Sequence, residues 1–273
     1  MLAVCATPIG NLDDVTLRVL RELAHADVVL CEDTRHTRGL LTRHGIEARL
    51  LSYHRHNEAA RTAELVPRLL GGEHVALVSD AGLPGMNDPG ARLIGAALEA
   101  GVPVTVLPGP SAVETALVAS GFVGERYQFL GYLPRREKAL GELWAELAAW
   151  PFPAVAFESP KRLPAALRSL AAAAPQRRVA MCRELTKRFE EVVQGSAAEL
   201  AERFAEPPKG EITLVLGPVD PADAPDGSGE QAALGAVGEL VAAGIPRRQA
   251  ADVVARLTRS SRNTLYRESL QSD

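Results

Sequence analysis

The stretch "HVALVSDAGLPGMNDPG" (residues 74–90) passes from an uninterrupted apolar run into a turn that holds three glycines, two prolines and two aspartates. A short apolar run bounded by turn residues is typical of a buried strand, and an Ala- and Leu-rich segment with helical character follows it. This succession predicts one repeating unit of a largely parallel sheet that helices cover.

The same alternation continues in both directions along the chain. A second series of apolar runs begins at "PAVAFES" (153–159) and ends at "GEITLVLG" (210–217). Two of its runs, 179–183 and 189–194, lie close together, so a mixed sheet is expected in this half. In the first half, strands are predicted near 2–7, 27–31, 48–52, 74–79 and 103–107, with helices near 14–25, 35–44, 57–71, 90–100 and 110–120.

Composition predicts where the domains meet. The segment 121–139 contains turn residues and a basic cluster, so one α/β domain is expected over 1–120 and a second over 121–217. Residues 218–229 are rich in Pro, Asp, Gly and Ser, which is typical of a linker.

Residues 230–273 predict a small helical extension that resembles a helix-turn-helix. Gly244 is placed to end its first helix, Pro246 to begin the second, and Ser260 or Ser261 to cap the third. Its basic character favours nucleic-acid contact, while a helical cap with a solvated basic face is the alternative. Between 247 and 267 a single acid, Asp252, accompanies Arg247, Arg248, Arg256, Arg259, Arg262 and Arg267.

Length and composition favour a soluble globular protein: 273 residues, 47% hydrophobic, with a net charge of −4. The N-terminus has no basic segment before its apolar run, and no apolar run reaches the roughly 18 residues that span a bilayer, so a cytoplasmic location is expected. Cys5, Cys31 and Cys182 sit in separate apolar runs, which predicts buried, reduced thiols rather than a zinc site.

The turn at 79–90 does not match a phosphate loop. Its glycines do not form G-x-G-x-x-G, the chain has no G-x-x-x-x-G-K-[ST], and the fixed carboxylates Asp80 and Asp88 would repel phosphate. Carboxylates suit a ligand with cationic and hydroxyl groups, such as S-adenosylmethionine. Asp80, at a strand tip, is expected to contact the ligand, and Asp88 to cap the turn and the next helix.

Nine motifs follow one another in order along residues 3–217. In this order they resemble the bacterial 16S ribosomal RNA cytidine 2′-O-ribose methyltransferases (the RsmI family), a branch of the tetrapyrrole-methylase-like enzymes. The basic tail resembles the C-terminal extension of that family. The motifs are "VCATPIGNLDDVTLRVL", "CEDTRHTRGLL", "SYHRHNE", "ALVSDAGLPGMNDPG", "VLPGPSA", "GYLPRR", "FESPKRL", "RELTKRFEEVVQG" and "KGEITLVLG".

The resemblance implies two α/β domains of the tetrapyrrole methylase type with the cofactor cleft between them. It also implies S-adenosylmethionine as cofactor, a homodimer, and methyl transfer to the 2′-hydroxyl of a cytidine in the small-subunit decoding region. The partner would be 16S ribosomal RNA or the small ribosomal subunit, with no membrane and no DNA. Low aromatic content predicts recognition by shape and phosphate position rather than by a broad stacking platform.

The wider superfamily pattern implies which residues touch the cofactor. Leu83 stands where the family usually has Thr, and "MNDPG" stands where "ISDPG" is common, so no hydroxyl contact is expected from position 83. The implied contacts are Pro8, Ile9, Asp80, Leu83, Ser111, Ala112, Phe157 or Glu158, Leu185, Gly210, Glu211 and Ile212.

Charged residues in "EDTRHTR" and "RELTKRFEE" are the catalytic candidates. Glu32 or Glu184 would accept a proton or hydroxyl hydrogen bond, while Arg35 and Lys187 would supply positive charge. The alternative is a salt-bridged helix surface. His54 and His56 would point the same way on a strand, but they lack a third ligand, so no metal is expected.

Three other functions compete with ribosomal RNA methylation. One is a tetrapyrrole methylase of the same fold that acts on a carboxylate-rich ring. A second is a non-catalytic RNA-binding or ribosome-assembly protein, and a third is a dinucleotide oxidoreductase, which the missing fingerprint disfavours.

Overall fold

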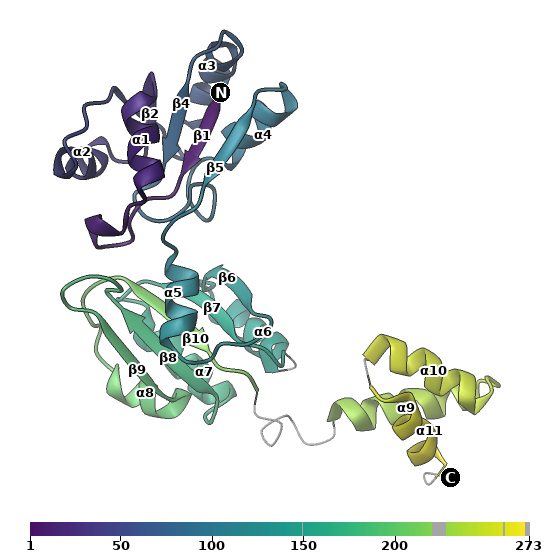
Figure 1. Cartoon of the computed structure of the whole chain (residues 1–273). Helices are drawn as coiled ribbons and strands as arrows, with labels where there is room; N and C mark the ends of the chain where they lie inside the picture. Colours follow the sequence, from purple (N-terminus) through teal and green to yellow (C-terminus); the bar gives the residue numbers. More distant parts are fainter. Residues whose placement is uncertain (149, 220–227, 259, 271–273) are drawn as a thin grey trace. The chain divides into compact units, whose positions relative to one another are not determined.

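A computed structural model describes residues 1–148, 150–219, 228–258 and 260–270 (Figure 1). The chain divides into two compact units, Met1–Gly141 with Phe152–Pro218, and Glu142–Pro151 with Val219–Asp273. Most of the predicted linker 218–229 and the tail residue Arg259 lie outside the described residues. None of the described helices is both long and apolar enough to cross a membrane.

The first sheet is fully parallel and has the strand order β3-β2-β4-β1-β5. Successive residues of its central strands point to opposite faces: Leu2 and Val4 enter one core, Ala3 and Cys5 the other. Both faces are therefore buried, which explains the unbroken apolar runs. Its strands are β1 (Leu2–Cys5), β2 (Val28–Cys31), β3 (Leu50–Ser52), β4 (Val75–Val78) and β5 (Val104–Leu107).

Four helices cover the two faces of this sheet, as Figure 1 shows. α1 (Leu17–His25) and α2 (Thr34–Arg43) pack on the face of Ala3, while α3 (Glu58–Leu70) and α4 (Ala91–Glu99) pack on the opposite face. A short 3-10 helix, Leu12–Asp14, precedes α1. The predicted alternation of strands and helices in this half is confirmed.

The second sheet is mixed, as predicted, with the order β6-β7-β10-β8-β9. β6 pairs parallel with β7, and the other neighbours are antiparallel. Its strands are β6 (Gln128–Tyr132), β7 (Ala154–Glu158), β8 (Arg178–Arg183), β9 (Glu191–Ser196) and β10 (Ile212–Leu216).

β6 lies within 121–139, where the sequence predicted only a connecting segment. The register of β6 against β7 shifts between Phe129 and Tyr132, and Gly131 has φ +68°. This irregularity interrupts the period-2 pattern that identifies a strand, so the sequence reading missed β6.

One of the helices that pack on the second sheet begins directly after the last strand of the first sheet. α5 (Ala112–Ala119) comes directly after β5 but packs on β7 and β10, with Ala116 and Leu117 in the core beside Val155 and Val215. The expected boundary at residue 120 thus follows a helix of the second sheet. The other helices of this sheet are α7 (Leu163–Ala173) and α8 (Ala197–Arg203), while α6 (Glu137–Ala148) begins in the first compact unit and ends in the second.

The tail forms the three predicted helices: α9 (Ser228–Ala242), α10 (Arg247–Thr258) and α11 (Arg262–Ser269). Gly244, with φ +90°, follows α9, and the Ser261 hydroxyl accepts the Thr264 N–H at the start of α11. Side chains from all three helices form a small apolar core: Val237, Ala250, Ala251, Val254 and Leu265.

Candidate functional site

The carboxyl ends of β1, β4 and β5 converge at one edge of the first sheet. Thr7 and Gly82 exchange two backbone hydrogen bonds, of 2.8 and 3.1 Å, and the Thr7 hydroxyl donates to the Ser79 carbonyl at 3.0 Å. Gly82 has φ +77°, a conformation that favours glycine. These bonds fix the turn after β4 against the end of β1, where open α/β sheets bind ligands.

Aromatic side chains of the second sheet form the facing wall. The Phe157 ring on β7 contacts the rings of Phe129 and Tyr132 on β6, at centroid separations of 5.1 and 5.6 Å. Tyr132 is 59% exposed although it lines the cavity. The chain is only 4% aromatic, so sequence composition did not predict this local cluster.

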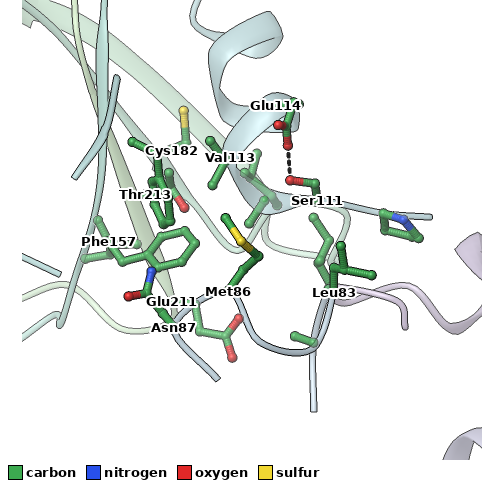
Figure 2. A pocket seen from close by; sticks show the side chains of 18 of the residues that line it. Leu83, Met86, Asn87, Ser111, Val113, Glu114, Phe157, Cys182, Glu211 and Thr213 are labelled. Atoms are coloured by element: carbon green, nitrogen blue, oxygen red, sulfur yellow. Dashed lines mark hydrogen bonds between the residues drawn. The ribbon is translucent and has the colours of Figure 1, made fainter. Parts of the chain in front are cut away.

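A cavity of about 680 Å³ lies between these walls, a size that suits a cofactor. Figure 2 shows Leu83, Met86 and Asn87 of the turn after β4, together with Phe157, Cys182 and Thr213 of the second sheet. Ten of the predicted cofactor residues line it: Ile9, Leu83, Ser111, Ala112, Phe157, Glu158, Leu185, Gly210, Glu211 and Ile212.

The other two predicted cofactor residues, Pro8 and Asp80, line a separate small cavity beside Thr7 and Ser79. One Asp80 carboxylate oxygen accepts the backbone N–H of Asp33 at 3.1 Å, which ties the tip of β4 to the start of α2. In the described structure Asp80 thus holds neighbouring strand ends together, and it stands behind the cavity wall rather than in it.

The expectation that Asp88 caps a helix is wrong. The N-cap of α4 is Gly90, which has no side-chain cap, and the half-buried Asp88 lines the large cavity. Burial, followed by repulsion from Glu32 and Asp80, raises the pKa of Asp88 from 3.8 to about 6. Prolines and glycines beside an aspartate predict a turn, but they do not reveal that its carboxylate faces a cavity.

The start of α5 supplies a polar corner of the cavity. The Ser111 hydroxyl and the Tyr127 hydroxyl both donate to Glu114, the latter at 2.6 Å; Figure 2 shows the first of these bonds. Burial acts to raise the pKa of Glu114, but these hydrogen bonds outweigh it and the pKa is lowered. Glu114 is therefore an ionised acceptor that orients Ser111, and the sequence reading did not single it out.

Glu158, which was also predicted to contact the cofactor, carries the buried carboxylate of the wall that the second sheet forms. Its side chain is 0% exposed and lies 3.0 Å from the guanidinium of Arg162, which is also bonded to the carbonyls of Leu133 and Pro134 at 2.7 and 2.8 Å. Burial raises the pKa of Glu158, and the Ser159 N–H and Arg162 oppose that rise. The pair connects the end of β7 to the segment after β6.

Two of the catalytic candidates, Glu184 and Lys187, pair with each other beside the lining residues Leu185 and Glu211, but neither of them lines the cavity itself. Glu184 accepts the Glu211 N–H at 2.9 Å and Lys187 Nζ at 3.0 Å, and the same Nζ lies 3.0 Å from the Glu211 carboxylate. The backbone bond from Glu211 is the main cause that lowers the pKa of Glu184. A carboxylate with a lowered pKa is a weak base, so the geometry gives Glu184 a positioning task.

The other two catalytic candidates, Glu32 and Arg35, are not among the lining residues of the cavity either. The Arg35 side chain is 89% exposed and pairs with Asp33 at 2.8 Å. This pairing lowers the pKa of Asp33 to about 2. Glu32 does not line the cavity either, and it acts on the site through its charge beside Asp88.

The two histidines considered for metal binding do not lie on a strand, contrary to the sequence reading. β3 ends at Ser52, and His54 and His56 follow in the turn before α3, with ring centroids 5.8 Å apart. Within the described residues, no group of three His, Cys, Asp or Glu side chains is placed to hold a metal ion. The three cysteines are buried free thiols, as predicted, and Cys182 also lines the cavity.

The fold and the cavity at its sheet edge define the class of protein. Residues 1–201 match the family of Tetrapyrrole (Corrin/Porphyrin) Methylases, and the chain belongs to this family. Solved structures with the same fold include the methyltransferase CobJ (19% identity, TM-score 0.61, 80% of this chain and 93% of that one). Another is uroporphyrin-III C-methyltransferase from Thermus thermophilus with S-adenyl homocysteine (20%, TM-score 0.56, 79% and 96%).

Relatives narrow the assignment to the branch named ribosomal RNA small subunit methyltransferase I. The Mesorhizobium japonicum protein of that name is 42% identical over 99% of this chain and 91% of its own length. Those of Synechocystis and Neisseria meningitidis serogroup A are 39% and 38% identical, over 99% and 97% of this chain and 98% and 91% of their own lengths.

Proposed function

We propose that this protein transfers a methyl group from S-adenosylmethionine to the 2′-hydroxyl of a cytidine in 16S ribosomal RNA. The observation that carries the proposal is near full-length similarity to enzymes named ribosomal RNA small subunit methyltransferase I. The cavity between the two sheets supplies a site for the reaction.

The cavity residues fit S-adenosylmethionine, which when bound supplies an electrophilic methyl group on a sulfonium. Ile9, Leu83 and Phe157 offer apolar surface. Gly210 has no side chain, so the backbone there can pass close to the cofactor. An ideal Cβ at Gly210 would lie 2.4 Å from Glu184 Cγ, so no side chain fits there. The lining contains no cationic side chain in its described part, which suits a cationic ligand better than a phosphate.

Alignment of the acceptor is the main task of these residues, because a sulfonium is already an excellent leaving group. The turn after β4 and the aromatic wall of β6 and β7 both line the cavity, and with the cofactor bound between them they would limit the access of water to the transferred methyl group. Glu184, Lys187 and Glu211 hold the third side of the cavity in place.

Exposed arginines support the choice of RNA as the substrate. Arg248 and Arg267 are exposed on the tail and make no ion pair with the described residues. Such arginines can contact phosphates, which position an RNA without reading its sequence. A cytoplasmic location follows from a ribosomal substrate.

A homodimer is part of the proposal. Val106, on the edge strand β5, and Val118, on α5, are 50% and 67% exposed, and a second copy of the chain would cover such apolar surface. Sedimentation equilibrium at micromolar concentration is expected to give twice the chain mass, and a monomer would contradict this part.

The decisive test starts from small ribosomal subunits of cells that lack this protein. Purified protein and labelled S-adenosylmethionine should methylate them, and mass spectrometry of RNA fragments should place the mark on one cytidine ribose. Methylation of uroporphyrinogen instead would support a tetrapyrrole methylase. Absence of S-adenosylmethionine binding in calorimetry would support a non-catalytic RNA-binding protein.

A further inference from the structure

The turn between β4 and α4 brings one carboxylate, that of Asp88, into the cavity wall. Neither sequence pattern nor family resemblance assigned this side chain a chemical task. Within the part of the chain that the structure describes, the Asp88 carboxylate makes no hydrogen bond or ion pair.

Two backbone anchors hold this turn on either side of Asp88. Arg55 Nη2 donates to the Asn87 carbonyl at 2.5 Å, and Glu58 Oε1 accepts the Gly90 N–H at 3.1 Å. Because both bonds use the backbone, they position Asp88 without occupying its carboxylate. A catalytic group needs this arrangement, in which the support is rigid and the reactive atoms are left available.

The Asn87 side chain also lies against the opposite wall, where it packs on β6. An ideal Cβ at Gly131 would lie 3.0 Å from Asn87 Oδ1, so this amide packs closely on the irregular part of β6. The turn therefore approaches both sheets, and Asp88 lies near Tyr132, whose pKa is raised by burial and by the Asp88 carboxylate.

The other carboxylates of the cavity lining have partners elsewhere, and so do Asp80 and Glu184, which lie next to lining residues. Asp80 accepts the Asp33 N–H, Glu158 pairs with Arg162, and Glu184 accepts the Glu211 N–H. Glu114 accepts two hydroxyls, and the Glu211 side chain pairs with Lys187. Each of these carboxylates has a partner that stabilises its charged form or holds it in its present position.

The charges that face Asp88 come from four elements. Glu32 follows β2, Asp80 follows β4, Arg55 follows β3, and the Tyr132 hydroxyl belongs to β6. Burial and the two carboxylates raise the pKa of Asp88 to about 6, while Arg55 opposes the rise. A base whose pKa lies near the pH of the reaction meets two requirements. A sufficient fraction of it is in the charged form that can accept a proton, and its proton affinity is high enough to take one up.

We propose that Asp88 is the general base that accepts the proton of the acceptor hydroxyl during methyl transfer, an inference that rests on the function proposed above. The acceptor oxygen forms a bond to the methyl carbon, and the bond from that carbon to sulfur breaks with its electron pair left on sulfur. The hydroxyl proton passes to an Asp88 carboxylate oxygen, from which it later reaches solvent.

The test compares the full-length wild type with Asp88→Asn, Asp88→Glu and the control Asp14→Asn, an exposed aspartate on the 3-10 helix. Unmethylated small subunits and labelled S-adenosylmethionine are the substrates. Asp88→Asn is expected to lower kcat at least about 100-fold with little change in KM. The wild-type kcat should rise through a limb near pH 6, and this limb should be missing in Asp88→Asn.

Asp88→Glu should recover part of the rate, and Asp14→Asn should behave as wild type. Calorimetry should give each variant an S-adenosylmethionine Kd within about twofold of wild type. An active wild type with an equally active Asp88→Asn would overturn this inference alone, and so would a large loss of cofactor affinity in that variant. A wild type that methylates no RNA would overturn the proposed function, and the inference with it.

Discussion

Glu184 accepts the backbone N–H of Glu211 at 2.9 Å, and this bond joins the loop after β8 to the start of β10. Glu184 itself has φ +52°, an uncommon conformation for a residue with a side chain. The bond is possible only because Gly210, beside Glu211, has no side chain to meet the carboxylate. One wall of the cavity therefore depends on a contact between two loops.

Gly210→Ala tests this dependence. The new Cβ would lie 2.4 Å from Glu184 Cγ at a backbone φ of +100°, so the loops must separate. We expect the free energy of unfolding to fall by about 1–3 kcal/mol and cofactor affinity to fall about tenfold or more. Urea denaturation and calorimetry measure the two effects.

Gly95→Ala is the matched control, because a Cβ there meets nothing within 4 Å and the residue lies inside α4. It should stabilise the protein by up to about 1 kcal/mol. If both variants bound the cofactor like wild type, the contact would not support the cavity wall.

A buried ion pair predicts a second effect on stability. Arg162→Met removes the partner of the fully buried Glu158 carboxylate and the donor to the Leu133 and Pro134 carbonyls. Breaking such a pair typically costs about 3–5 kcal/mol, because an uncompensated charge stays buried. Denaturation at pH 7 should show this loss. Arg168→Met, at an exposed position of α7, the helix that Arg162 precedes, should change stability by less than about 0.5 kcal/mol.

The pKa of Asp88 predicts how stability changes with pH. Because this pKa rises from 3.8 to about 6 on folding, the folded protein binds more protons between these values. The contribution of Asp88 to stability is therefore present below about pH 4, is lost as the pH rises to about 6, and stays absent above it. After allowance for solvent screening, the loss is about 1–2 kcal/mol.

Asp88→Asn should consequently be more stable than wild type at pH 8 and should lose this advantage at pH 4. Thermal or urea unfolding of both proteins at the two pH values measures the difference. A difference that did not depend on pH would mean that the carboxylate titrates in the folded protein as it does in the unfolded chain.

The sequence predicted the first sheet well because its signal is local. Leu2 to Cys5 alternate between two buried faces, and each of the strands β1 to β4 is followed by a helix with one apolar side. The ten predicted residues that line the cavity came from family resemblance and not from this local signal.

The tertiary features were harder to predict. Asp88 precedes α4 by three residues and so resembled a helix cap, but its orientation depends on anchors from Arg55 and Glu58, far away in sequence. Tyr132 reaches the cavity only because β6 pairs with β7 across an irregular register. Such contacts arise from the packing of segments that are distant in sequence, and the periodicity of the sequence does not predict them.

The tail arginines carry the last prediction, which concerns RNA rather than the cofactor. Arg248 and Arg267 are exposed, whereas Arg256 and Arg262 lie 3.8 and 3.9 Å from Asp252. If the two exposed arginines contact phosphates, Arg248→Gln with Arg267→Gln should weaken binding to small-subunit RNA at all salt concentrations tested. The slope of log affinity against log salt should become shallower by about 1 to 2.

The control is Arg92→Gln, an exposed arginine on α4, which should leave the slope unchanged. S-adenosylmethionine affinity should be the same in every variant, because the cavity lies in the other unit of the chain. Equal slopes for the tail variant and wild type would show that Arg248 and Arg267 do not contact phosphates, as expected if this face of the tail is only a solvated basic surface.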